Sequence, residues 1–576
     1  MLKTGADIPE QFANVYETLY NSVNDDQGLE ELRQKLVAAG ISASDTDNIT
    51  PDVVKQAVNK MKSGKTDVSG QFTSDALINA PDNLFILLSS LFRAFFIHED
   101  FTFDIMCCAF MPLLKGALKD DTNSNNYRAI AISALLLKVL DNVILILYGD
   151  LLQSDHLQFG YKKKTSGTQC SWMVLEVVQH YLRNNTTVKA AWLDCSRAFD
   201  TCVFSTLFTK ILDRGVPAII VRGLLVIYSQ QRCWVKWQAN QTTSRVFGVL
   251  NGTRQGSCLS PCIFAVYLDG LLAELRDSGC GCFLDEFVGA AAFADDLALL
   301  SPSRDGLQRM LDITEDYARR HNLSFSTDPS PAKSKSKAMH FRAGREPDPA
   351  PVTLCGRVLP WVERADHLGH TISYTGSQDL DCNAARGSYI GTSNEILNMF
   401  SFGSAAQKLY AVQTYSCAWY GAMLWSLYSE SANRAYRSWN TTIKMAHGLP
   451  RNTKTYVVEN YLCPLPSVRQ LILRRYVQFV QSLISSTNPV IGKLARLAVS
   501  SVRSTTGLNV RQMKDEFQLD PLKVNKKMFV VRKADLPEHG EDNIELLDYL
   551  LYIRNNETEE EIISELNDLI HKVCTV

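Results

Sequence analysis

The sequence predicts a mixed α+β fold, with a central region of alternating strands and helices between two helical regions. From about residue 101 to 345, strand-like apolar runs alternate with amphipathic helices, which is typical of layered helices and sheet. Residues 1–100 and 385–533 instead show mainly helical patterns. The chain has 576 residues, of which 46% are hydrophobic and 21% are charged. This composition excludes a disordered chain and leaves ample material for a sizeable core.

The N-terminal region, residues 1–100, is predicted to be an acidic helical extension. It holds 8 basic and 15 acidic side chains. Thr50 followed by Pro51 is typical of a helix start, because Thr caps the first turn and Pro fits its geometry. Asp25–Gly28 and Ser42–Pro51 are rich in Asp, Asn, Ser or Gly, so we expect them to be loops.

The C-terminal part of the chain joins a basic block to an acidic tail. Residues 431–533 hold 18 basic and 4 acidic side chains, whereas residues 534–576 hold 2 and 12. A basic block can bind a polyanion by displacing its counterions, but it can also be a solvated helical face, and the charge pattern leaves both open. An apolar stripe at near-helical spacing lies in the block, formed by Leu471, Leu473, Tyr476, Val477 and Val480. One or two surface helices are expected in the tail, around Ile544–Ile553 and Glu560–Val573.

Cysteine usage and hydropathy point to a reduced compartment. The 15 cysteines are scattered and none forms the C-x2-C pair of a structural zinc site. Residues 1–9 lack the apolar segment of a secretory signal. The most apolar stretch, Ile130–Leu152, is interrupted by Lys138 and Asp141, so a buried helix is favoured over a membrane span. We therefore expect an intracellular protein with free thiols and no membrane partner.

The sharpest chemical signal is the pair Asp295-Asp296, which lies between two apolar, strand-like runs. This pattern predicts that the pair occupies the turn of a β-hairpin. An ordinary Asp-rich turn is the simpler alternative, although such turns favour Asn-Gly or Asp-Gly. Two adjacent carboxylates repel each other unless a cation lies between them. The pair is therefore a candidate divalent-metal site.

A second carboxylate, Asp194, ends the strand-like run that begins at Val188. A charged group at the end of a buried strand is costly unless it is paired or bound to metal. With Asp295 and Asp296 it would complete a three-carboxylate set on two neighbouring strands, which suits Mg²⁺. Two such ions can stabilise the attacking and leaving oxygens of a phosphoryl transfer.

A third segment, Gly252–Asp269, lies between the two acidic segments. Its Gly- and Ser-rich start leads into Pro261, with Ser260 just before it, which predicts a helix beginning there. Glycine lets a backbone approach a phosphate or base closely. The loop alone is weak support for a binding site, and its position between the acidic strands strengthens it.

These three segments together resemble motifs A, B and C of a reverse transcriptase of the non-LTR, LINE-type retrotransposon family. Motif A is Asp194-x4-Phe199, motif B is the run from Arg254 to Pro261, and motif C is Phe293–Asp296. Further matches lie along residues 50–500: Asn126–Ser133 in the fingers, Gln158–Thr168 before motif A, Ser326–Phe341 as motif D, Leu368-Gly369 as motif E, and Tyr420–Trp425 in the thumb. The ordered motifs make this a specific resemblance.

The resemblance implies a role for each matching residue. Asp194, Asp295 and Asp296 would be catalytic and would bind two Mg²⁺ ions, for which Mn²⁺ is a possible substitute. Phe199 would be the aromatic gate that excludes a 2′-OH, Arg128 would hold the triphosphate, and Gln255 and Gly256 would lie against nucleotide and template. Lys335 best matches the motif D lysine, which could protonate pyrophosphate, with Lys333 and Lys337 as rivals. A core phenylalanine and a surface ion pair are the simpler alternatives for Phe199 and Arg128.

The resemblance also implies a right-hand polymerase, with fingers, a palm that contains a ferredoxin-like sheet, and a helical thumb. We expect fingers and palm at 101–345, a palm hairpin and connector at 346–384, a basic helical thumb at 385–533 and an acidic tail at 534–576. The implied partners are an RNA template, a DNA primer and dNTPs. Residues 1–100 offer no room for the endonuclease that many LINE-type proteins carry, so a separate endonuclease is expected. The nucleus is the expected place of action, with the cytoplasm as an alternative.

Departures from the family pattern leave two other functions open. Cys258 stands at the first proline of motif B, and Ala129 replaces the usual proline in the fingers segment. Neither change removes a charge, although loop geometry could differ. A catalytically silent nucleic-acid-binding relic, or a fragment of a retrotransposon polyprotein, is one alternative to an RNA-directed DNA polymerase. An RNA-directed RNA polymerase is the other: Phe199 disfavours it, while Asp200 near the same position could recognise a ribose.

Overall fold

The computed structural model describes residues 7–522, apart from 71, 101–102, 117–118, 238–241, 329, 331–332, 343, 345, 417–418, 455–464 and 519–521. The predicted acidic tail at 534–576 and its two expected helices lie outside the described residues. The chain divides into two compact units. Unit 1 comprises Met1–Cys170 and Tyr181–Ala365, and unit 2 comprises Ser171–His180 and Asp366–Val576. The finer domain boundaries expected from the sequence stay predictions.

Unit 1 begins with short helices, as the sequence predicted for this region. They are α1 (Ile8–Tyr20), α2 (Asp26–Ala38), the 3-10 helix η1 (Ala43–Thr46), α3 (Pro51–Asn59), α4 (Ser74–Ile78) and α5 (Asp82–His98). The predicted cap at Thr50 is confirmed, because its side chain accepts a hydrogen bond from the Val53 N–H. The expected loop at Asp25–Gly28 is wrong, since α2 already begins at Asp26, and the polar residues that suggested a loop form its first turn.

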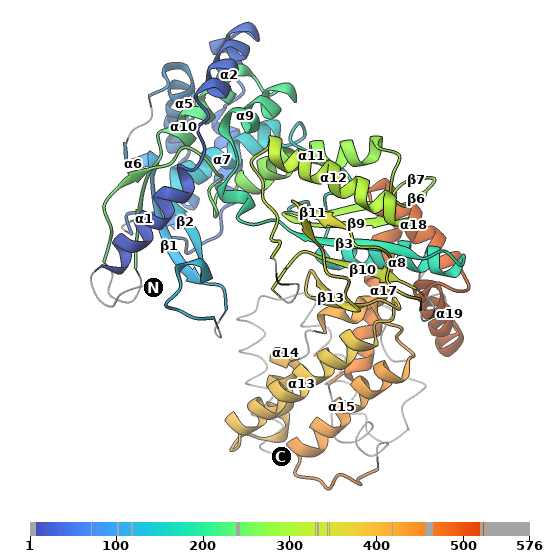
Figure 1. Ribbon diagram of the computed structural model, residues 1–576. Helices are drawn as coiled ribbons and strands as arrows, with labels where there is room; N and C mark the ends of the chain where they lie inside the picture. Colours follow the sequence, from blue (N-terminus) through green and yellow to red (C-terminus); the bar gives the residue numbers. More distant parts are fainter. Residues whose placement is uncertain are drawn as a thin grey trace. The chain divides into compact units, whose positions relative to one another are not determined.

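The first sheet of unit 1 has four strands in the order β2-β1-β4-β5. Its strands are β1 (Cys107–Leu114), β2 (Tyr127–Ser133), β4 (Arg232–Val235) and β5 (Phe247–Gly248), and the helices α6 (Phe103–Met106), α7 (Leu135–Tyr148), α9 (Phe204–Asp213) and α10 (Ala218–Ser229) belong to the same unit. Apolar side chains of α1 pack with this sheet, beside which α1 runs in Figure 1. The stretch Ile130–Leu152 is therefore not one buried helix: its first residues end β2, and the buried helix is α7.

The second sheet of unit 1 carries the acidic segments. Its four strands, β3 (Val188–Asp194), β8 (Ala290–Phe293), β9 (Asp296–Ser301) and β10 (Lys337–Phe341), are all antiparallel to their neighbours in the order β10-β3-β9-β8. Helices α11 (Ser260–Asp277) and α12 (Arg304–Arg320) connect them, and α12 packs on β3 and β9 with α11 beside it (Figure 1). Chain order β-α-β-β-α-β is that of a ferredoxin-like sheet. The predicted α+β class is confirmed.

Unit 2 is mainly helical. Helix α8 (Gly167–Arg183) contributes its middle turns, and the other elements are α13 (Asp379–Met399), α14 (Ala405–Ser416), η4 (Tyr420–Leu424), α15 (Glu430–Ala446), α17 (Val468–Ile484), α18 (Pro489–Ser500) and α19 (Thr505–Phe517). The apolar stripe predicted around Tyr476 lies on α17 and is buried. Within the unit, Glu176 of α8 accepts a hydrogen bond from the Thr506 hydroxyl of α19 at 2.6 Å, which fixes the α8 segment to the bundle.

Short strands form three small hairpins: β6 (Phe283–Leu284) pairs with β7 (Glu286–Phe287), and β11 (Thr353–Leu354) pairs with β12 (Arg357–Val358). The third joins β13 (Arg364–His367) to β14 (His370–Ser373). Leu368-Gly369, the expected motif E turn, connects these last two strands. Among the helices that the structure describes, none combines the length and the apolar character needed to cross a membrane.

Unit 1 should lose stability in mild acid because His321, which follows α12, is buried as the neutral imidazole. Its ring stacks on Tyr317 with centroids 3.7 Å apart. Burial, aided by the charge of Lys210, lowers the pKa of His321 from 6.5 to about 4. The imidazole of His321 therefore binds a proton more readily in the unfolded chain than in the folded one. Its contribution to the free energy of unfolding is complete above pH 6.5 and is lost as the pH falls toward 4. We expect it to amount to roughly 3 kcal/mol.

Urea unfolding of wild type and His321→Phe at pH 7 and pH 4.5 measures this contribution. Phenylalanine keeps the aromatic contact with Tyr317 and cannot titrate. The variant should lose clearly less unfolding free energy between the two pH values than wild type does. Equal losses in the two proteins would show that His321 does not govern the acid response.

Candidate active site

The three predicted aspartates lie together at one end of the second sheet of unit 1. Asp194 is the last residue of β3, and it pairs directly with Asp296, the first residue of β9. Opposite residues of an antiparallel pair point to the same face, with Cβ atoms about 5 Å apart. Asp295 precedes Asp296 in the connection from β8. The expected three-carboxylate set on two neighbouring strands is therefore present.

The hairpin turn itself differs from the prediction by one residue. Phe293 pairs with Asp296, so the two loop residues are Ala294 and Asp295, and Asp296 belongs to the strand. Ala294 takes the left-handed backbone conformation with φ 58° and Asp295 does not, as in a type II′ turn. This turn leaves Asp295 at the tip and brings Asp296 opposite Asp194. The uncommon backbone at Ala294 is what offsets the pair from the turn centre.

Burial and neighbouring carboxylates disfavour the charged forms of Asp295 and Asp296. Burial raises the pKa of Asp295, and the charge of Asp194 raises it further while Arg128 lowers it. Although Asp296 reaches solvent, the surrounding chain partly desolvates its carboxylate, and this burial, followed by the charges of Asp295 and Asp194, raises its pKa to about 6. A bound cation would relieve both the desolvation and the repulsion.

Magnesium fits this donor set by its chemistry. In the described part of the chain, no three His, Cys, Asp or Glu side chains form a ready-made metal cage. Mg²⁺ does not need one, because it keeps several waters and binds through one or two carboxylates together with substrate phosphates. An open set of hard oxygen donors that repel one another in the free protein is therefore compatible with Mg²⁺.

Of the three rival lysines, Lys335 lies at the aspartates. Its Nζ is 3.4 Å from Asp194 Oδ2, and its side chain is 69% exposed. Lys333 is exposed, and Lys337 is paired with Trp192 inside β10. The neighbouring Ser336 hydroxyl accepts a hydrogen bond from the Asp194 N–H at 3.2 Å. The segment before β10 thus holds both the backbone and the carboxylate of Asp194.

The predicted binding loop, residues 252–259, contacts the first sheet of unit 1. The Gln255 carbonyl accepts a hydrogen bond from the Ala131 N–H of β2 at 2.7 Å. Gly256 has φ 128°, and a Cβ there would lie 2.4 Å from the Ala131 carbonyl oxygen, so no side chain fits. Helix α11 starts at Ser260, with Pro261 in its first turn and Leu259 before it, one residue earlier than predicted.

Phe199 and Asp200 lie in a short 3-10 turn, η3 (Ala198–Asp200), directly after β3. The Phe199 ring is half-buried and stacks on Phe264 of α11, with centroids 4.1 Å apart. The Asp200 carboxylate is buried, and its Oδ1 accepts hydrogen bonds from the Tyr20 hydroxyl at 2.6 Å and the Gln255 amide at 2.8 Å. The Asp200 carboxylate is therefore hydrogen-bonded within the protein.

Arg128 is exposed on β2, and its side chain makes no hydrogen bond or ion pair with another described residue. Its positive charge nevertheless lowers the pKa of Asp295. A guanidinium with no partner among the described residues is available to a phosphate ligand. The surface ion pair that was its simpler alternative is not present among the described residues.

Residues 117–372 match the protein family described as reverse transcriptase (RNA-dependent DNA polymerase). They form a reverse transcriptase domain. The relatives to which the chain is similar are proteins of retrotransposable elements, which agrees with the resemblance suggested by the sequence motifs. With the mixed helix-and-sheet architecture, the match also confirms the predicted right-hand polymerase class.

Two relatives from Drosophila melanogaster illustrate the similarity. The chain is 24% identical over 273 residues to the "Retrovirus-related Pol polyprotein from type-2 retrotransposable element R2DM", covering 45% of this chain and 24% of that protein. It is 26% identical over 299 residues to the "Putative 115 kDa protein in type-1 retrotransposable element R1DM", covering 50% and 26%. The chain therefore spans about a quarter of the length of these curated relatives.

A solved structure of apo telomerase from Candida tropicalis, truncated from its C-terminal domain, is also similar to the chain. The similarity has a TM-score of 0.33 at 12% sequence identity, over 55% of this chain and 62% of that one.

A buried ion pair supports the binding loop of the reverse transcriptase domain. The sequence pattern did not predict this pair. Arg254 is 4% exposed, and its Nη2 lies 3.4 Å from Asp141 Oδ1 of α7. The other Asp141 oxygen accepts a hydrogen bond from the Ser257 hydroxyl at 2.6 Å. Asp141 thus holds both sides of Gln255-Gly256. In the sequence, Asp141 is a single carboxylate in the apolar stretch Ile130–Leu152, and it was used only as an argument against a membrane span.

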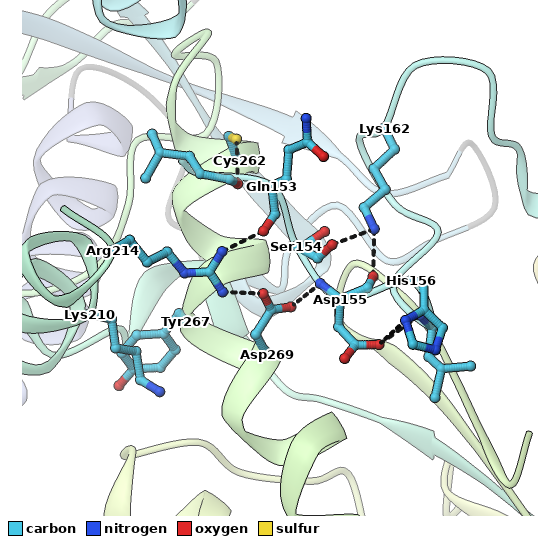
Figure 2. A network of polar contacts seen from close by, with 12 residues as sticks. Gln153, Ser154, Asp155, His156, Lys162, Lys210, Arg214, Cys262, Tyr267 and Asp269 are labelled. Atoms are coloured by element: carbon cyan, nitrogen blue, oxygen red, sulfur yellow. Dashed lines mark hydrogen bonds and ion pairs between the residues drawn. The ribbon is translucent and has the colours of Figure 1, made fainter. Parts of the chain in front are cut away.

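A second polar network anchors α11, the helix that follows this loop (Figure 2). Arg214, just after α9, bridges the Gln153 carbonyl and Asp269 of α11, with 2.5 Å from its Nη2 to Asp269 Oδ2. The other Asp269 oxygen accepts the Asp155 N–H at 3.0 Å, and Lys162 donates to the Ser154 and Asp155 carbonyls. Arg214, Asp269 and residues 153–155 of this network line a pocket of about 650 Å³. It fixes the segment before α8 to α11 and so limits movement of the helix.

The two departures from the family pattern leave the fold of the domain intact. Ala129 is buried in β2 opposite Pro112. Unlike a proline, it retains the backbone N–H that can donate within a sheet. Cys258 is exposed in the loop before α11. Neither residue displaces Gln255, Gly256 or the three aspartates.

Proposed function

We propose that this chain is an RNA-directed DNA polymerase that extends a primer 3′-OH with dNTPs on an RNA template. The observation that carries the proposal is the pairing of Asp194 with Asp296, next to Asp295, inside a reverse transcriptase domain. Paired carboxylates at a strand end are costly without a cation, and phosphoryl transfer makes use of such cations. The relatives are retrotransposon Pol polyproteins, so retrotransposition is the process we propose.

Asp194 and Asp295 would hold Mg²⁺, with Asp296 assisting. Bound there, Mg²⁺ would supply charge stabilisation for the attacking 3′ oxygen and the leaving pyrophosphate, and Mn²⁺ is a possible substitute. Lys335, whose ammonium lies at Asp194, would give a proton to the leaving pyrophosphate. Exposed Arg128 would hold the triphosphate by bidentate contacts. Most of the catalysis would then be positioning and charge stabilisation.

The sugar would be selected by Phe199, with Gln255 and Gly256 against the nucleotide and template. The Asp200 carboxylate is buried and its Oδ1 accepts hydrogen bonds from Tyr20 and Gln255, which disfavours its contact with a ribose hydroxyl. This favours a DNA polymerase over an RNA polymerase with the same palm. We also propose a separate endonuclease and action in the nucleus, which the resemblance to LINE-type proteins implies.

Primer extension tests the proposal directly. The chain is incubated with a DNA primer on an RNA template, with dNTPs or rNTPs, in Mg²⁺ and then in excess EDTA. We expect extension with dNTPs, at least about 100-fold less with rNTPs, and none in EDTA, since positioned polar and steric contacts discriminate strongly between such substrates. A folded chain that binds the template–primer but extends it in neither Mg²⁺ nor Mn²⁺ would instead be a binding relic or an incomplete polyprotein fragment.

A further inference from the structure

The first helix of the chain ends at the candidate active site. Tyr20, the last residue of α1, is 3% exposed, and its ring stacks on Phe110 of β1 with centroids 5.1 Å apart. Its hydroxyl donates a hydrogen bond of 2.6 Å to Asp200 Oδ1. Since α1 lies along the β1–β2 sheet (Figure 1), the ring is fixed by the core and the hydroxyl has one position.

Asp200 joins this helix to the binding loop. The oxygen that accepts the Tyr20 hydroxyl also accepts the Gln255 amide at 2.8 Å. The Gln255 backbone is bonded to Ala131 of β2, so the remaining freedom of this residue lies in its side chain, and that is held by Asp200. Hydrogen bonds to a carboxylate are among the stronger ones in proteins. Loss of the Tyr20 hydroxyl would leave Gln255 as the remaining side-chain donor to a buried carboxylate.

Backbone contacts extend the same connection to Phe199. The Tyr20 carbonyl accepts the N–H groups of Leu250 and Asn251 at 2.8 and 3.0 Å. The Asn251 amide donates to the carbonyl of Asp200 at 2.8 Å, and the Thr253 N–H donates to the carbonyl of Phe199 at 2.6 Å. The end of α1, the turn that carries Phe199 and the start of the binding loop are therefore one hydrogen-bonded unit.

From this geometry we infer that Tyr20 is a positioning residue for the incoming nucleotide, acting through Asp200 on Gln255 and Phe199. The inference rests on the proposed polymerase function and adds to it a role for the N-terminal helix in sugar selection. A steric gate discriminates by a few tenths of an ångström, so the turn that carries it must be held rigidly. Tyr20 supplies this restraint from outside the family motifs.

The test compares Tyr20→Phe with Tyr16→Phe in steady-state extension with dNTPs and rNTPs. Tyr16 lies one turn earlier on α1, is equally buried, and its hydroxyl has no hydrogen-bond partner among the described residues. We expect Tyr20→Phe to raise the KM for dNTP about 10-fold and to lower the dNTP-over-rNTP preference about 10-fold, with kcat within about twofold, as for the loss of one hydrogen bond to a charged group. Tyr16→Phe should match wild type.

A second variant separates positioning from general packing. If Tyr20 acts through Asp200, adding Tyr20→Phe to Asp200→Ala should change KM and selectivity by less than twofold, because alanine already removes the oxygen that accepts from both Tyr20 and Gln255. Unchanged KM and selectivity in Tyr20→Phe, while wild type extends the primer, would overturn the inference and leave the polymerase proposal standing. Equal losses in Tyr16→Phe would also overturn it. A wild type that neither extends nor retains dNTP in a complex with template–primer would overturn both.

Discussion

Asp295→Asn should reduce dNTP incorporation about 1,000-fold and leave template–primer binding unchanged. Asparagine has nearly the same shape but removes the charge at the tip of the β8–β9 turn. Metal-bound oxygens are worth several kcal/mol in phosphoryl transfer, and about 1.4 kcal/mol corresponds to a factor of ten in rate. Single-turnover extension measures the chemical step, and fluorescence anisotropy of a labelled template–primer measures binding.

The same variant should be at least as stable as wild type. Burial and the charge of Asp194 raise the pKa of Asp295, which means that the folded chain disfavours the ionised carboxylate. Removing that charge therefore removes an unfavourable electrostatic contribution in the metal-free protein, as is common at functional sites. A loss of activity with no loss of stability is the signature of a functional carboxylate.

Asp285→Asn is the matched control, because Asp285 lies in the turn of another hairpin, β6–β7, outside the sheet of Asp194. Its activity should stay within about twofold of wild type, as expected for a surface change away from the site. Equal activity of Asp295→Asn and wild type in the single-turnover measurement would rule out Asp295 as a ligand in catalysis.

The aspartates could be predicted from the sequence because their signal is local. Each lies at the end of an apolar run, and a carboxylate in that position is costly unless it has a partner. Strand periodicity then allows two such ends to lie side by side, as Asp194 and Asp296 do. The one-residue error at the turn arose because backbone conformation, the positive φ of Ala294, is not visible in the residue types.

The supporting contacts could not be predicted because they join distant parts of the chain. Tyr20 and Asp200 are 180 positions apart, and Asp141 and Arg254 are 113 apart. No periodicity or spacing links such pairs, and only the packing of α1 and α7 brings them together. The acidic composition of residues 1–100 even suggested a separate extension, whereas α1 packs with the first sheet of unit 1. A lone buried charge such as Asp141 indicates that a partner exists without showing which residue it is.

Asp141→Asn should lower the unfolding free energy of unit 1 by roughly 3–5 kcal/mol. Asparagine retains a hydrogen-bond acceptor for the Ser257 hydroxyl but leaves the Arg254 guanidinium buried without a counter-charge. Breaking a buried ion pair costs this much because the remaining charge is still desolvated. Two Arg254 nitrogens, Nε and Nη1, have no hydrogen-bond partner among the described residues, and the Tyr228 ring, 4.9 Å from the guanidinium carbon, attracts the charge without neutralising it. Urea unfolding of the variant and wild type at pH 7 measures the difference.

A matched exposed ion pair and a double variant make this prediction specific. Glu30 and Arg33 of α2 lie 3.5 Å apart, close to the 3.4 Å of the buried pair, but their side chains are 59% and 66% exposed. Glu30→Ala should therefore cost less than about 1 kcal/mol. Adding Arg254→Met to Asp141→Asn removes the stranded charge and should recover most of the lost stability, because an apolar side chain of similar length then fills the site. If Asp141→Asn costs no more than Glu30→Ala, water or another group must reach Arg254, and the binding loop would not depend on this pair.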